Sequence, residues 1–349
     1  MRYFLSFFTL LFIFTNCQKD TSPVTVFPGF GPADWLVPKN EVLDGGVGLD
    51  GIPSIDNPQF STPTEIGPYY DNNLVLGFVN KGVIKSYPIP ILDWHEIVND
   101  EVGGLPISIT YCPLTGTGIG WSRLVNGIET SFGVSGLLYN SNLMPYDRRT
   151  NSTWSQLENK CVNGNFIGRT PQTYTLVETN FSTWQKAFPD TKVMNGNTGF
   201  DRAYAFYPYG DYVTNNDLVF YPLNNKDNRL PAKERLLGVL INDAKKTYQF
   251  NDIAAGTAII YDEIDNQQLI IIRSKKENFI IAFFNEKNLK FEAKQDGWPI
   301  LMTDDKGNAY NLVGQVIDGP DVGTRLAQPH AYMGYWFAWG AFFPDVEIY

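Results

Sequence analysis

A dense block between Asp93 and Gln156 holds the residue types that could do chemistry in this chain. It contains one of the two histidines and one of the three cysteines, together with acidic, guanidinium and aromatic side chains. A thiol near an imidazole and a guanidinium should lose its proton easily, because positive charge favours the reactive thiolate. We therefore predict that three catalytic candidates converge in one pocket: Cys112, His95 and Arg148. Four further residues are expected in its wall as binding groups: Glu96, Tyr146, Asp147 and Trp154.

The sequence around Cys112 predicts a strand that ends at a turn. Residues 107–111 alternate between apolar and polar types, and Pro113 and a glycine-rich stretch follow the cysteine. The backbone can approach a ligand closely at such a place. Two other interpretations stay open: a buried structural thiol, and a disulfide with Cys161 in an exported protein.

The other candidates also have structural interpretations. His95 could orient or deprotonate Cys112 or share a metal with it, but beside Trp94 it could equally be a half-buried imidazole. Asp147 could pin a loop through an internal ion pair, while Arg148 offers its planar fork to a carboxylate or phosphate. The sequence contains no phosphate loop, dinucleotide fingerprint or clustered metal-ligand spacing, so it leaves any metal or cofactor unknown.

Strand patterns dominate the elements that must position these residues. We predict a mainly β fold with a few short helices (α+β), built as two related β-rich halves from an internal duplication. The halves span residues 70–195 and 235–349, joined by a connection at 196–234 that is rich in Tyr, Asn and Pro. Four pairs of segments carry this prediction: 76–87 with 237–248, 184–193 with 339–348, 147–152 with 304–309, and Gly164 and Gly168 with Gly319 and Gly323.

The duplication separates scaffold from site. Both halves keep a Trp followed by Phe-Pro-Asp, whereas the chemical candidates occur only in the first half. The region matching Cys112 is Ile270-Ile271-Ile272-Arg273-Ser274, which carries nothing reactive. We therefore expect one site, in the first half.

The first residues predict a lipoprotein signal. Arg2 is followed by an apolar run from Phe4 to Phe14 that is too short to span a bilayer, and then by Cys17. Residues 1–16 are expected to be removed and Cys17 to carry lipid as the membrane anchor; ordinary secretion is the alternative. Residues 18–20 (Gln-Lys-Asp) resemble a surface-export signal, so the expected location is the outer membrane or cell surface.

Charge and composition limit the classes of partner that this protein can bind. Loss of residues 1–16 leaves 333 residues and, because Arg2 is lost, takes the formal charge from −10 to −11. Such an acidic surface repels phosphate backbones, so we expect no nucleic-acid partner. Prolines and glycines fill much of residues 17–69, which predicts a tether followed by irregular chain.

The motifs of the block resemble a bacterial and archaeal family catalogued as domain of unknown function 3179. The resemblance begins at the opening motif, Asp50-Gly51-Ile52-Pro53, and reaches Tyr349. It implies no activity. Relatives often carry Cys-Pro-x-Cys, but this chain has Thr115 at the last position, which excludes a local dithiol or a thiolate-pair metal site.

Two function classes follow from the sequence, and whether the protein is an enzyme stays open. One is a thiol- or metal-dependent reaction at Cys112 and His95. The other is a non-catalytic surface lipoprotein that binds a small molecule or glycan, since the chain has 19 tyrosines and eight tryptophans that could stack on sugar rings. In β-rich proteins such residues more often pack in the core.

Overall fold

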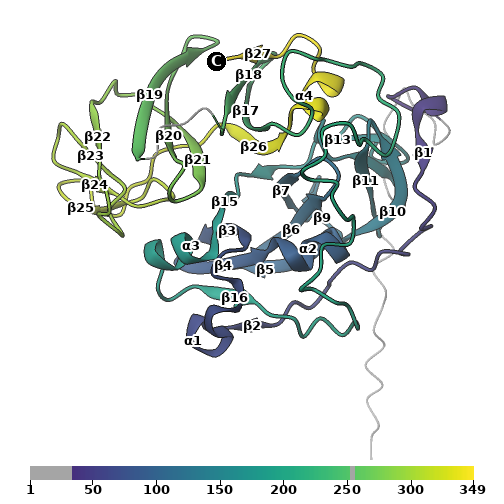
Figure 1. Cartoon of the computed structure of the whole chain (residues 1–349), viewed down its shortest axis with the longest axis horizontal. Coiled ribbons are helices and arrows are strands. Elements are labelled where there is room, and N and C mark those ends of the chain that lie inside the picture. The colour runs from purple at the N-terminus through teal and green to yellow at the C-terminus, as the bar shows by residue number, and fades with distance from the viewer. Residues whose placement is uncertain (1–33, 252–255) are drawn as a thin grey trace, which may run out of the picture.

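The computed structural model describes residues 34–251 and 256–349. The predicted signal at residues 1–16, Cys17 and the start of the tether lie outside the described residues. The mainly β fold is confirmed (Figure 1). The described residues include four short α-helices, α1 (Pro63–Ile66), α2 (Ile89–His95), α3 (Phe181–Ala187) and α4 (Trp336–Phe342), and two 3-10 helices, η1 (Lys39–Glu41) and η2 (Gly67–Tyr70). None of the helices in these residues is long and apolar enough to cross a membrane.

One sheet of the first half is built around a tight hairpin. Its strands are β15 (Val177–Asn180), β3 (Leu74–Asn80), β4 (Val83–Pro88), β16 (Lys192–Met194) and β2 (Phe60–Ser61), in that order. Lys81 and Gly82 both have positive φ, as a two-residue turn between right-twisted strands requires. Helix α3 connects β15 to β16 and buries Trp184 completely.

A sheet of the second half has the same order and strand directions. Its strands are β26 (His330–Tyr335), β17 (Arg235–Ile241), β18 (Ala244–Gln249) and β27 (Glu347–Ile348). Strand β26 is antiparallel to β17 and β27 is parallel to β18, as β15 is antiparallel to β3 and β16 is parallel to β4. Helix α4 connects β26 to β27 and buries Trp339.

The two sheets also repeat an ion pair. Lys85 Nζ lies 2.8 Å from Asp100, which also accepts a hydrogen bond from the hydroxyl of Tyr87 at 2.7 Å. In the second half, Asp262 of a neighbouring sheet makes the corresponding contacts, with Lys246 Nζ and with the hydroxyl of Tyr248, each at 2.7 Å.

The remaining sheets flank these two (Figure 1). The first half has a sheet of β14 (Thr173–Tyr174), β7 (Thr117–Ser122), β6 (Leu105–Cys112) and β5 (Ile97–Val102), and a hairpin of β8 (Leu124–Val125) and β9 (Ile128–Glu129). Its third sheet consists of β1 (Leu43–Asp44), β10 (Phe132–Tyr139), β11 (Asn142–Asp147), β12 (Thr153–Ser155) and β13 (Lys160–Asn163); here β1, like β2, is added from the segment before residue 70. In the second half the remaining sheets comprise β19 (Thr257–Ile264), β20 (Gln267–Ser274) and β21 (Phe279–Phe284), then β22 (Phe291–Ala293), β23 (Met302–Asp304), β24 (Ala309–Tyr310) and β25 (Val316–Asp318).

The two halves share their cores. One buried cluster joins Val75 and Ile109 of the first half to Ile270 of the second, and another joins Cys112 to Trp336. Residues 196–234, all of them described, form neither helix nor strand. This connection packs Tyr209 and other aromatic side chains on the second cluster, so it covers the junction between the halves.

Candidate functional site

His95 holds two distant segments together. Helix α2 ends at His95, and its ring lies between the carbonyl of Pro53 and the hydroxyl of Tyr204, each 2.7 Å from a ring nitrogen. A carbonyl only accepts, so Nδ1 carries the proton and Nε2 accepts from the tyrosine. Burial lowers the pKa of His95, which keeps the ring neutral. Both nitrogens are therefore committed to joining the opening motif and the connection.

Arg148 binds the same N-terminal segment as His95, at Asp50 and Ser54. Its guanidinium makes two hydrogen bonds of 2.8 Å to the carboxylate of Asp50 and one of 3.0 Å to Ser54. The hydroxyl of Tyr146 donates to Asp50 at 2.6 Å. These contacts lower the pKa of Asp50 against the opposing effect of burial and raise the pKa of Arg148. Arg148 and Tyr146 thus fasten the start of the fold to β11.

Asp147 and Trp154 stabilise a turn. The buried carboxylate of Asp147 accepts hydrogen bonds from the backbone N–H and hydroxyl of Thr150 and from the indole of Trp154. The predicted pinning of a loop by Asp147 is therefore observed, although its partners are neutral donors rather than a cation.

Cys112 lies at the end of β6, as predicted, in an apolar setting. Its side chain is buried, and Sγ lies 3.8 Å from the carbonyl oxygen of Ser141. Burial first, and then the nearby carboxylate of Glu96, raises the pKa of the thiol to about 11. This direction is opposite to the one expected from the sequence, because no imidazole or guanidinium among the described residues contributes to it.

Both described cysteines are free, so the disulfide alternative is absent from the structure. Cys161 is also buried, with Sγ 3.3 Å from the carbonyl of Asn163, and burial raises its pKa to about 12. His95 and Arg148 both bind residues 50–54, whereas Sγ of Cys112 lies against the carbonyl of Ser141. None of these contacts joins the three side chains directly, and their convergence in one pocket stays a prediction.

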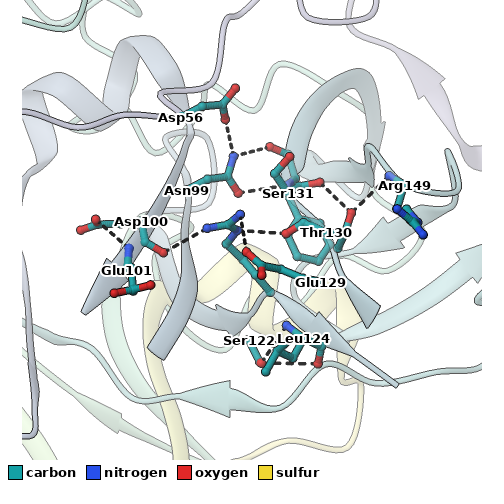
Figure 2. A network of polar contacts seen from close by, with 12 residues as sticks. Asp56, Asn99, Asp100, Glu101, Ser122, Leu124, Glu129, Thr130, Ser131 and Arg149 are labelled. Carbon is teal, nitrogen blue, oxygen red and sulfur yellow. Dashed lines mark hydrogen bonds and ion pairs between the residues drawn. The ribbon is translucent and has the colours of Figure 1, made fainter. Parts of the chain in front are cut away.

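Figure 2 shows a separate polar network around Asn99, which extends to Asp100, Glu129 and Thr130. The side-chain NH2 group of Asn99 donates hydrogen bonds to the carboxylate of Asp56 and to the backbone carbonyl of Phe132. Its side-chain oxygen accepts a hydrogen bond from the backbone N–H of Phe132. Arg123 bonds the carbonyls of Asp100 and Thr130 and the carboxylate of Glu129. Because its side chains satisfy one another, this network needs no ligand to explain it.

A second set of polar groups includes two members, Tyr212 and Lys233, that each bury an atom without a hydrogen-bond partner among the described residues. We call it the interior cluster, and it consists of Glu96, Cys112, Tyr209, Tyr212 and Lys233. Electrostatic coupling links the members: Cys112 is coupled to Glu96, to both tyrosines and to Lys233. Burial raises the pKa of Glu96 to about 8. The cluster joins the end of α2, the end of β6 and the connection.

Lys233 is the member with the most unusual surroundings. Its side chain is 7% exposed, and Nζ lies 3.0 Å from the ring centroid of Tyr212 and 4.8 Å from that of Phe337. Neither Nζ nor the hydroxyl of Tyr212 has a hydrogen-bond partner among the described residues. Burial lowers the pKa of Lys233 to about 7. A free amine is therefore well populated there at neutral pH.

A cavity of about 330 Å³ opens beside the interior cluster. Its lining consists of Tyr70, Asn73, Pro90, Asp93, Tyr204, Ala205, Phe206 and Tyr207. Asp93 is 7% exposed, and its Oδ1 lacks a hydrogen-bond partner in the described part of the chain. Burial raises its pKa from 3.8 to about 8. A carboxyl group left unpaired in a cavity wall is a candidate for binding or acid–base work.

The sequence did not single out Asp93, Lys233 or the tyrosines of the connection as site residues. Asp93 lies in the block, and the tyrosines give a visible compositional signal, but neither forms a motif that indicates a role. Lys233 gave no local signal, because a single lysine before a strand is common. Of the predicted site residues, only Cys112 and Glu96 belong to the interior cluster.

Within the described residues, no three His, Cys, Asp or Glu side chains lie close enough together to hold a metal ion.

Comparison with known proteins gives one match. The sequence model of a family described as "Protein of unknown function (DUF3179)" matches residues 49–346. No curated protein and no solved structure matches the chain.

Proposed function

This chain belongs to that family of unknown function, and we propose that it is a lipid-anchored extracytoplasmic enzyme whose interior cluster acts on a small carbonyl compound through the amine of Lys233. The lipid anchor is supported by the apolar signal before Cys17.

One observation carries the proposal: buried polar groups without a hydrogen-bond partner occur both in the connection and in the wall of the cavity that it lines. Asp93, Tyr212 and Lys233 each bury an atom with no hydrogen-bond partner among the described residues. Leaving a buried polar group unsatisfied costs about 1–3 kcal/mol, and more for a charged group. Three such groups in one region are expensive for stability alone, and perturbed ionisable groups gather at functional sites.

The order of the pKa values selects the amine over the thiol. With Lys233 near 7 and Cys112 near 11, the proton remains on the sulfur when the amine is free. The attraction between the Lys233 ammonium and the ring of Tyr212 raises the pKa of the lysine. Desolvation lowers that pKa, and for a buried lysine it is the larger effect. Lys233 is therefore the better nucleophile at neutral pH.

The reaction that fits is imine formation. The amine nitrogen of Lys233 adds to the carbonyl carbon, and its proton passes to the oxygen. Loss of one water then gives the imine. Glu96, with its pKa near 8, is protonated at neutral pH and can donate a proton to the departing oxygen.

We also infer that the halves arose by duplication. The shared strand order and the repeated Lys-Tyr-Asp ion pair support this inference. Two equivalent glycines also support the duplication. A Cβ at Gly77 would lie 2.2 Å from the ring of Trp184, and a Cβ at Gly238 would lie 2.0 Å from the ring of Trp339. Apart from this common scaffold, α2 and Cys112 are found in the first half and have no counterpart among the described residues of the second half.

Reductive trapping tests the proposed reaction. The chain starting at Gln18 is treated at pH 7 with a limiting amount of glycolaldehyde and sodium cyanoborohydride, and the modified lysine is identified by peptide mass. Lys233 should be labelled before the exposed Lys226 of the same connection, and Lys233→Met should lose only that label. Equal or slower labelling of Lys233 would count against the proposal.

One observation favours the alternative, a non-catalytic glycan-binding lipoprotein. The connection exposes the rings of Phe200, Phe206 and Phe220, with Phe206 72% exposed. Phe220 also lines a cavity of about 680 Å³ at the other end of the connection. Binding of soluble oligosaccharides that is lost in Phe206→Ala and Phe220→Ala, without aldehyde trapping at Lys233, would support this function instead.

A further inference from the structure

We propose that the cavity beside Asp93 binds a small organic ammonium ion, held by the carboxylate of Asp93 and the aromatic rings around it. The inference rests on the proposed function and deepens it by naming the ligand class recognised in the cavity beside the interior cluster, where Asp93 is an electrostatic neighbour of Tyr209.

The cavity has the composition of an ammonium site. Four of its lining residues are aromatic: Tyr70, Tyr204, Phe206 and Tyr207. Aromatic faces attract organic cations, most strongly where water is excluded. The volume of about 330 Å³ lies at the small end of ligand pockets. Phe206 is 72% exposed while it lines the cavity, so the cavity reaches the protein surface.

Asp93 supplies the missing countercharge. Its Oδ1 is buried without a partner among the described residues, and no lysine or arginine is part of the cavity lining. A carboxylate desolvated in this way is costly unless a cation pairs with it. An ammonium ligand would remove that cost, whereas an anionic ligand would add to it.

The groups facing Asp93 do not compete for this role. Its electrostatic neighbours are the hydroxyls of Tyr111 on β6, Tyr207 and Tyr209 on the connection, and Tyr335 on β26. Burial raises the pKa of each of these tyrosines, so all four stay neutral below pH 10. Glu96 and Lys233 of the interior cluster, with pKa values of about 8 and 7, titrate in the same range, but neither lines the cavity. Asp93 is therefore the group in the cavity lining whose charge changes between pH 6 and pH 9, and its Asn variant separates its effect from theirs.

The direction of the pH effect follows. Without ligand, Asp93 is mostly protonated at pH 6 and mostly ionised at pH 9, since its pKa is about 8. A cation binds the ionised form, so its affinity should rise about a hundredfold from pH 6 to pH 9, in proportion to that form.

Choline and its uncharged carbon analogue, 3,3-dimethylbutan-1-ol, test the inference. Choline keeps its charge at every pH, and the two molecules differ in shape very little. Binding to the chain starting at Gln18 is measured by isothermal titration calorimetry at pH 6, 7.5 and 9. Choline should bind at least tenfold more tightly than the alcohol, with the pH dependence above.

Three variants locate the site. Asp93→Asn should abolish the preference for choline and flatten the pH dependence, while Phe206→Ala should weaken choline binding severalfold. Asp305→Asn, which removes an exposed acid on the second half, should change neither.

Equal affinity for the two probes, or pH-independent choline binding, would overturn the ammonium site. Unchanged binding in Asp93→Asn would also overturn it. If choline fails to bind while Lys233 is still trapped by aldehyde, the ligand class is wrong and the proposed function stands. If choline binds but Lys233 is not trapped, the proposed function fails and the cavity remains a binding site.

Discussion

The Nζ atom of Lys233 lies 3.0 Å from the centroid of the Tyr212 ring, in a buried setting that offers it no hydrogen-bond acceptor among the described residues. Both residues belong to the connection, so the contact holds two of its segments together within the interior cluster. Desolvation of the charged Lys233 side chain destabilises the fold, and this effect can be measured as a change in the free energy of unfolding.

Lys233→Met should stabilise the fold at pH 7. The pKa of Lys233 falls from 10.5 to about 7 on folding, so between these values the unfolded chain binds more protons and wild-type stability rises with pH. The cost is full below pH 7 and disappears above pH 10.5. We expect the variant to be more stable by on the order of 2–4 kcal/mol at pH 7, and the difference to shrink by pH 10. Urea denaturation at both pH values measures it, with Lys226→Met as the control. A variant less stable than wild type at pH 7 would mean that Lys233 is a well-paired cation.

The thiol of Cys112 should react slowly. With a pKa of about 11, its ionised fraction at pH 7.5 is roughly 300-fold below that of an ordinary thiol. Iodoacetamide labelling of a Cys161→Ser variant should therefore be slow in buffer and rapid in guanidinium chloride. Adding His95→Ala should not slow the labelling, since the imidazole bonds Pro53 and Tyr204. Labelling faster than that of a free thiol would restore the thiol-site hypothesis.

Gly77→Ala and Gly238→Ala should each destabilise the protein. The new Cβ would lie 2.2 Å from the Trp184 ring or 2.0 Å from the Trp339 ring, and neither buried indole can move away cheaply. Overpacking of this kind costs about 1–3 kcal/mol or more. Gly196→Ala is the matched control, because its Cβ would meet Tyr204 at an ordinary 3.6 Å. Chemical denaturation of all three variants should show losses only at Gly77 and Gly238.

The anchor prediction concerns Cys17. The unaltered protein should fractionate with membranes, and Cys17→Ala should be released or left unprocessed, because the lipid and not a basic patch would hold this acidic chain to the bilayer. Cell fractionation with mass analysis of the N-terminus measures both effects. A variant that remains membrane-bound and normally processed would rule out lipidation at Cys17.

The sequence by itself determined the local structure of this protein. Alternation of apolar and polar residues identifies β6 and its end at Cys112, and the Lys81-Gly82 turn sets the first hairpin. These features depend on neighbours in the chain, so a local pattern is enough to predict them. The block contains Asp93, Glu96 and Cys112 of the candidate site, whereas Lys233 and the tyrosines of the connection lie outside it.

Only the tertiary structure decided which side chains meet. Asp93, His95 and Glu96 are near neighbours at the end of α2, but successive helical residues point about 100° apart, so each faces a different partner. Asp93 lines the cavity, His95 bonds Pro53 and Tyr204, and Glu96 is coupled to Cys112. Lys233 reaches the same interior from the far end of the connection, and a pairing over that distance is set by how the two halves pack, which no local pattern encodes.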